Sequence, residues 1–121
     1  MSRMETVNRI LRDLQTGTPD VEACALVSED GLMIASALPH HIDETRVAGM
    51  TATLASLGFR AAEELERGEV QQVMVRGKEG YALMFQASNH TLLLVMASKM
   101  AKLGLIFLDT SRAATQIAKI L

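Results

Sequence analysis

The chain has 121 residues, of which 49% are apolar, and it carries a net charge of −2. This length suffices for one domain with a single core. A nearly neutral charge, with three Phe, one Tyr and no Trp, argues against nucleic-acid binding, which needs a basic surface and usually aromatic stacking platforms. No apolar run is long enough to cross a membrane, and the N-terminus has no signal-peptide pattern. We therefore expect one cytoplasmic domain, residues 1–121, that binds neither nucleic acid nor membrane.

The first half of the chain predicts a helix, a hairpin and a second, longer helix. Apolar residues at helical spacing predict a helix over residues 3–16, which Gly17 and Pro19 terminate. Residues 21–28 are mostly apolar and predict a strand that is covered on both faces. Gly31 supplies the positive φ of a tight turn, and residues 32–37 return as the antiparallel partner. Asp43 is the expected N-cap of a long helix over residues 43–68.

The second half predicts three strands and a closing helix. Residues 69–76 alternate imperfectly, as a partly exposed strand does, and residues 81–86 form the next strand. Residues 91–97 are the most apolar stretch, which indicates a strand at the centre of the sheet. A helix is expected over residues 100–120, with a possible bend or boundary near Asp109. Short turns make neighbouring strands antiparallel, so the predicted class is α+β, with helices covering the sheet.

The long helix carries two apolar stripes where a surface helix needs only one. We expect the large stripe to pack on the sheet of its own chain; it consists of Val47, Met50, Leu54, Leu57, Ala61 and Leu65. The small stripe is rotated by about 100° from the large one and consists of Ala48, Ala52, Ala55, Phe59 and Ala62. Its alanines are either ordinary helix formers or a surface on which a second helix packs closely. An aromatic ring is costly to leave in water, so Phe59 favours symmetric pairing with a second copy.

The sequence contains no recognisable motif for catalysis or metal binding. The only Gly-Lys pair, residues 77–78, precedes Glu rather than Ser or Thr and so is no phosphate loop. The three histidines, His40, His41 and His90, lack the number and spacing of zinc ligands, and no nucleophile elbow is present. Cys24 is interpreted as a small hydrophobic residue in a buried strand. We expect no catalytic residue, no metal and no cofactor, and hence a non-enzymatic protein.

An alternative is a small-molecule sensor. A sheet flanked by helices can hold a ligand between its layers, and the eight methionines could line such a pocket. Methionine is more often an adaptable filler of a core.

The ordered combination of elements resembles the Roadblock family, named after dynein light chains. The resemblance lies in the SEDGLMIAS hairpin, the long Ala-rich helix ending in ELERGEV and the closing strand TLLLVMAS, and it covers almost the whole chain. It implies a five-stranded antiparallel sheet between helices, in the order α-β-β-α-β-β-β-α. It also implies a homodimer in which the long helix and the following strand meet their copies. Bacterial and archaeal members typically partner small Ras-like GTPases, as activators, co-regulators or scaffolds.

The resemblance assigns residues to two surfaces. The implied homodimer face comprises Ala48, Ala52, Ala55, Phe59 and Ala62, followed by Val70, Gln71, Gln72, Val73, Met74 and Val75. The implied GTPase-facing surface is the polar strip of the long helix, namely Arg46, Gly49, Thr53, Ser56, Arg60, Glu63 and Arg67. Its mixed charge suits a transient polar interface. An arginine on a rigid helix reaches poorly into a partner's site, so we expect reshaping of that site rather than an arginine finger.

Overall fold

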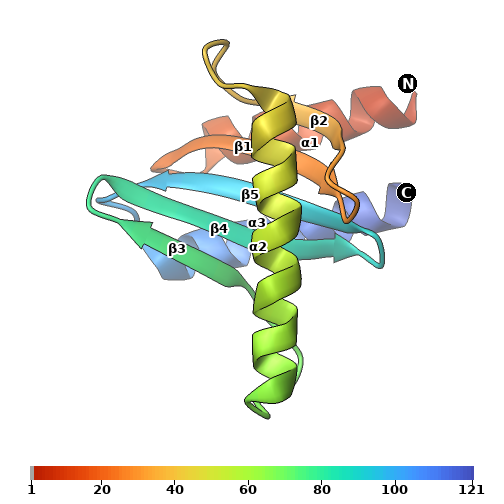
Figure 1. Cartoon of the computed structure of the whole chain (residues 1–121). Coiled ribbons are helices and arrows are strands. Elements are labelled where there is room, and N and C mark those ends of the chain that lie inside the picture. The colour runs from red at the N-terminus through yellow and green to blue at the C-terminus, as the bar shows by residue number, and fades with distance from the viewer. Residues whose placement is uncertain (1) are drawn as a thin grey trace.

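Residues 2–121, which the computed structural model describes, form an α+β sandwich. The elements are α1 (Arg3–Gly17), β1 (Val21–Ser28), β2 (Met33–Ala37), α2 (Glu44–Glu64), β3 (Val73–Gly77), β4 (Gly80–Ser88), β5 (Thr91–Ser98) and α3 (Leu103–Ile120). The strands make one antiparallel sheet in the order β2-β1-β5-β4-β3. Helices α1 and α3 cover one face, and α2 crosses the other (Figure 1). The predicted class and element order are confirmed.

Most predicted boundaries agree with the structure, and the largest differences follow α2. The Asp43 carboxylate accepts a hydrogen bond from the Arg46 N–H at 3.2 Å, as an N-cap does. The helix ends at Glu64 rather than at residue 68, because Glu66 and Gly68 adopt positive φ values of 56° and 84°. As a result, β3 begins four residues later than residue 69. Helix α3 runs unbroken through the region around residue 109.

The core is thick on one side of the sheet. Strand β5 lies at the centre, as predicted, and Leu93 and Val95 are fully buried beneath α1 and α3. The large side chains of this layer include Leu11 from α1 and Ile106 and Ile117 from α3. Their burial supplies most of the apolar area that holds the fold together.

The core is thin on the side of α2. It consists of only five buried residues, of which the one from α2 is an alanine: Ala25, Val27, Ala48, Met84 and Leu94. The β1–β2 turn and the start of β3 both lie close to α2, and each meets it at a glycine. The β1–β2 turn passes so near to α2 that a Cβ on Gly31 would lie 3.5 Å from the Cα of Gly49. A Cβ on Gly58 would lie only 2.4 Å from Cγ2 of Val73, so this glycine lets β3 begin against the helix.

Candidate interaction surface

The two stripes of α2 face the opposite way from the prediction. In the small stripe, Ala48 and Ala55 are 0% and 1% exposed because they pack on the sheet of their own chain. In the large stripe, Met50 and Leu57 are 53% and 54% exposed. Because the sheet presents a shallow surface here, α2 must approach closely, and only small side chains allow that. The prediction that the large stripe packs on the sheet is therefore wrong for most of its members: Met50, Leu54, Leu57, Ala61 and Leu65 are exposed, and only Val47 is half-buried against the thin core.

The same correction applies to the expected dimer face. Ala48 and Ala55 cannot contact a second chain, since their own sheet already covers them. Ala52, Phe59 and Ala62 are half-buried. Of the residues expected after the helix, Val73 packs on the thin core, and Val70 and Gln71 line a groove with α3 before the strand begins. Gln72 also precedes β3, whereas the side chains of Met74 and Val75 are exposed within it.

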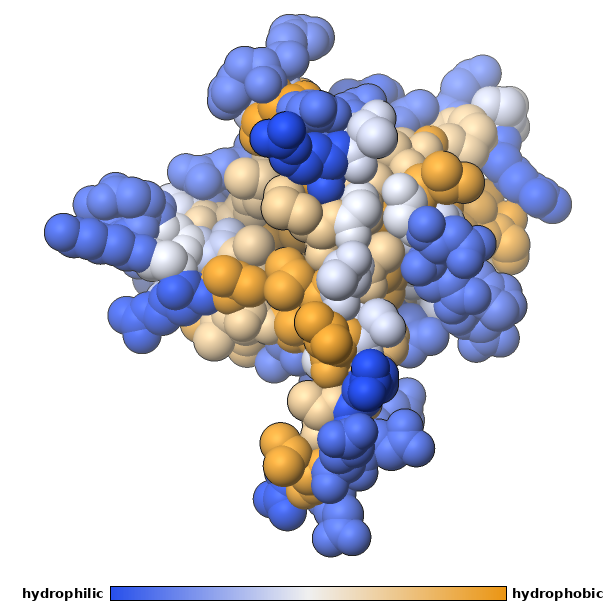
Figure 2. Space-filling view, viewed as in Figure 1, coloured by the Kyte–Doolittle hydropathy of each residue, from blue (hydrophilic) through white to orange (hydrophobic). Residues whose placement is uncertain are grey.

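The exposed large stripe continues onto the sheet. Three cross-strand neighbours, Val75, Ala82 and Met96, lie in register on β3, β4 and β5. Val75 is 43% exposed, and the other two are partly exposed. Figure 2 shows apolar residues gathered along the side of α2 that borders this part of the sheet. The helix and the sheet thus form the wall and floor of one apolar surface.

Strand β3 lies at the edge of the sheet beside this surface. Its residues pair with β4 from Val73 opposite Met84 to Gly77 opposite Gly80. Its other backbone edge has no strand partner among residues 2–121. An unpaired edge is a template on which another strand can pair.

The polar strip lies along the remaining side of α2. Arg46, Thr53, Ser56, Arg60 and Glu63 are exposed, Gly49 is half-buried, and Arg67 lies beyond the helix end. Arg60 makes a long ion pair of 3.9 Å with Glu64, one helical turn away. Such an exposed pair is weak, so this side of α2 is free to make polar contacts.

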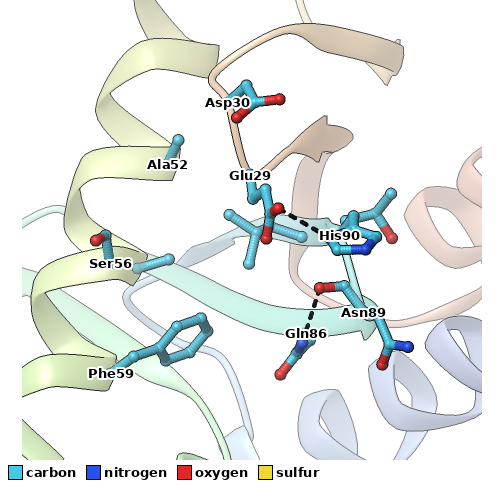
Figure 3. Close-up of a pocket in the computed structure, with 11 residues that line it drawn as sticks. Glu29, Asp30, Ala52, Ser56, Phe59, Gln86, Asn89 and His90 are labelled. Carbon is cyan, nitrogen blue, oxygen red and sulfur yellow. Dashed lines mark hydrogen bonds and ion pairs between the residues drawn. The ribbon is translucent and has the colours of Figure 1, made fainter.

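A groove separates the polar strip from two turns of the sheet. It has a volume of about 280 Å³ and is lined by Ala52, Ser56 and Phe59 of α2, by Glu29 and Asp30 after β1, and by residues around His90 between β4 and β5. The Phe59 ring points into it, and Nδ1 of His90 lies 2.8 Å from a Glu29 carboxylate oxygen (Figure 3). Sequence reasoning missed this groove because Glu29 and His90 are 61 residues apart and belong to no motif.

The family assignment rests on the sequence itself. Residues 7–97 match the family model of the Roadblock/LC7 domain. The chain belongs to the Roadblock/LC7 family. An uncharacterized protein of Methanocaldococcus jannaschii is 33% identical over 111 residues, which cover 92% of this chain and 96% of that protein.

Solved structures of Roadblock/LC7 folds resemble this one closely. The gliding protein MglB from Thermus thermophilus superposes with a TM-score of 0.86 at 21% identity and covers 99% of this chain and 91% of its own. A structure of MglB in a tetrameric arrangement gives the same TM-score and identity, and covers 99% of this chain and 90% of its own. At this level of identity, the likeness concerns the fold.

In this Roadblock/LC7 chain, Cys24 has a structural role, and the possible metal ligands are dispersed. Cys24 is fully buried in β1, where its S–H donates to the Leu11 carbonyl at 3.2 Å, which confirms its interpretation as an interior residue. Burial raises the pKa of the Cys24 thiol from 9.0 to about 12. Within residues 2–121, no three His, Cys, Asp or Glu side chains gather as metal ligands would. In the same range, no helix combines the length and apolarity that a membrane crossing requires.

Proposed function

We propose that this Roadblock/LC7 chain forms a homodimer through the large stripe of α2 and the edge strand β3. The observation that carries this proposal is the exposure of large apolar side chains along one side of α2, next to the apolar row of the sheet. Burying a side chain of the size of Leu or Met fully is worth about 1.5–3 kcal/mol. A symmetric dimer covers such a surface on both chains at once.

Strand β3 fits the same dimer. If the two β3 edges pair antiparallel, each supplies the backbone partners that the other lacks, and the two sheets become one. The tetrameric arrangement of a similar MglB is consistent with self-association of this fold. The expected face therefore consists of Met50, Leu54, Leu57, Ala61 and Leu65, with the β3 residues from Val73 to Val75, in place of the small stripe.

We further propose that the dimer binds a small Ras-like GTPase in the cytoplasm and regulates or scaffolds it without catalysing a reaction of its own. The support is family membership together with the polar strip, which stays free when the large stripes of two chains are covered. The strip carries both charges and several hydroxyls, a composition suited to a reversible interface. Arg60 lies between Ser56 and Glu63 in the strip, and Arg46 lies at its N-terminal end.

The GTPase proposal is tested with the small Ras-like GTPases of the organism that encodes this chain. Calorimetry should detect binding, and GTP hydrolysis should be measured with and without the chain. A regulator changes the rate, whereas a scaffold binds and leaves it unchanged. Arg60→Glu should weaken binding by about tenfold, and Arg12→Glu on the exposed side of α1 is the matched control. Absence of any binding by the wild-type chain would contradict the proposal.

A further inference from the structure

The groove beside the polar strip is built from two kinds of surface. Its lower part is apolar, with Ala52, Ala55 and Phe59 from α2 and Leu92 from β5. Its rim on the sheet side carries the carboxylates of Glu29 and Asp30, and no Lys or Arg lines it. Figure 3 shows Phe59 and the two turns on opposite sides of the same hollow.

These surfaces match a long cationic side chain. Lys and Arg bury an aliphatic stem against apolar groups while their charged end stays at a polar rim. An aromatic ring adds attraction for a cation placed over its face. Glu29 already pairs with His90, whereas Asp30 makes no ion pair with any of residues 2–121. Asp30 is thus the acceptor that remains for an incoming charge.

The position of the groove argues for a side chain of a protein partner over a free metabolite. A second hollow continues it along α2 as far as Leu57, at the border of the large stripe. It is lined by Glu29, Asp30, Gly31, Gly49, Ala52, Thr53, Ser56 and Leu57. Three of these residues, Gly49, Thr53 and Ser56, belong to the polar strip, so a protein that covers the strip also covers the groove.

We propose that this groove receives an arginine or lysine side chain of the partner GTPase, with Asp30 as its acceptor. This inference rests on the proposed function, which it deepens by naming the contact. It gives Phe59 and the β1–β2 turn a role in partner selection, because a partner without a cation at this point leaves the Asp30 carboxylate without a counter-charge.

The decisive measurement compares the affinity of the GTPase for the wild-type dimer and for Asp30→Lys. Charge reversal should raise the Kd about tenfold to a hundredfold and flatten its dependence on salt. The matched control is Glu22→Lys, which reverses an exposed carboxylate of β1 that makes no ion pair with any of residues 2–121. It should change the Kd less than twofold. Equal affinities for wild type and Asp30→Lys would overturn the inference and leave the proposed function standing.

A second measurement does not need the GTPase. N-acetyl-arginine amide, titrated into the ¹⁵N-labelled dimer at millimolar concentration, should shift the amide signals of Asp30, Gly31, Ser56 and Asn89. N-acetyl-norleucine amide, which has a similar stem and no charge, should not. Equal shifts with both probes, or none with either, would overturn the groove's preference for a cation. If the GTPase does not bind the wild-type dimer, the proposed function is wrong and the GTPase is not the partner. This titration still tests whether the groove prefers a cation.

Discussion

Cys24 shows how burial sets the chemistry of a single residue. It lies in β1 beneath α1, and its thiol is bonded to the Leu11 carbonyl and has no access to solvent. Desolvation raises its pKa to about 12, against 9.0 in the unfolded chain. Its thiolate is therefore scarce at neutral pH, and the residue serves as core packing rather than as a nucleophile.

This shift predicts a pH dependence of stability. Because the folded-state pKa is raised, the contribution of Cys24 is fully present below pH 9 and is lost between pH 9 and pH 12, as the unfolded chain releases the proton first. Between pH 8 and pH 10, the wild-type chain should lose about 1.4 kcal/mol relative to Cys24→Ala. Urea unfolding of both proteins at one fixed chain concentration measures this. A difference between the two proteins that stays constant with pH would contradict the burial of the thiol.

The two glycines of helix α2, Gly49 and Gly58, have different roles. Gly49 has nothing within 4 Å of the position of a Cβ, whereas Gly58 has Val73 against it at 2.4 Å. A glycine inside a helix costs about 0.5–1 kcal/mol relative to alanine. At Gly58, that cost is offset by the contact that places the start of β3.

Alanine substitutions at the two glycines should therefore have opposite effects. Gly49→Ala should stabilise the chain by about 0.5–1 kcal/mol, since it improves helix propensity without a clash. Gly58→Ala should destabilise it by about 1–3 kcal/mol through overpacking against Val73. The double variant Gly58→Ala, Val73→Ala should recover part of that loss. Thermal or urea unfolding measures all three, and stabilisation by Gly58→Ala alone would show that α2 and β3 do not meet in this way.

The orientation of α2 marks the limit of sequence reasoning for this chain. Helical spacing correctly separated three sides of the helix, and Asp43 correctly placed its start. Spacing cannot tell which apolar side faces the sheet, because that depends on the volume that distant residues such as Ala25 and Met84 leave beneath it. The size of its side chains predicts that the large stripe faces inward, whereas the thin core accepts the small stripe.

For the whole molecule, the element order and the central place of β5 could be predicted because they follow from local patterns. Strand 91–97 is apolar on both faces, and short turns enforce antiparallel pairing. The groove could not be predicted, since Glu29, Phe59 and His90 come from three separate segments and meet only through the fold. The spacing on α2 predicts Phe59 as a dimer contact, and its ring lines this groove.

The assembly follows from the same arrangement. One side of α2 holds the sheet; in the proposed assembly, the large stripe meets a second copy, and the polar strip with its groove binds a partner. Because the first side is already occupied within the chain, the proposed dimer depends on whether a second copy covers the large stripe.

The most direct test is the mass in solution of Leu57→Glu, compared with wild type and Leu108→Glu. Leu57 and Leu108 are similarly exposed leucines, at 54% and 48%, on α2 and on the outer side of α3. Light scattering at micromolar concentration should give a dimer for wild type and Leu108→Glu. It should give a folded monomer for Leu57→Glu, because the substitution places a charge in the proposed interface. A Leu57→Glu protein that remains a dimer of wild-type stability would contradict the account.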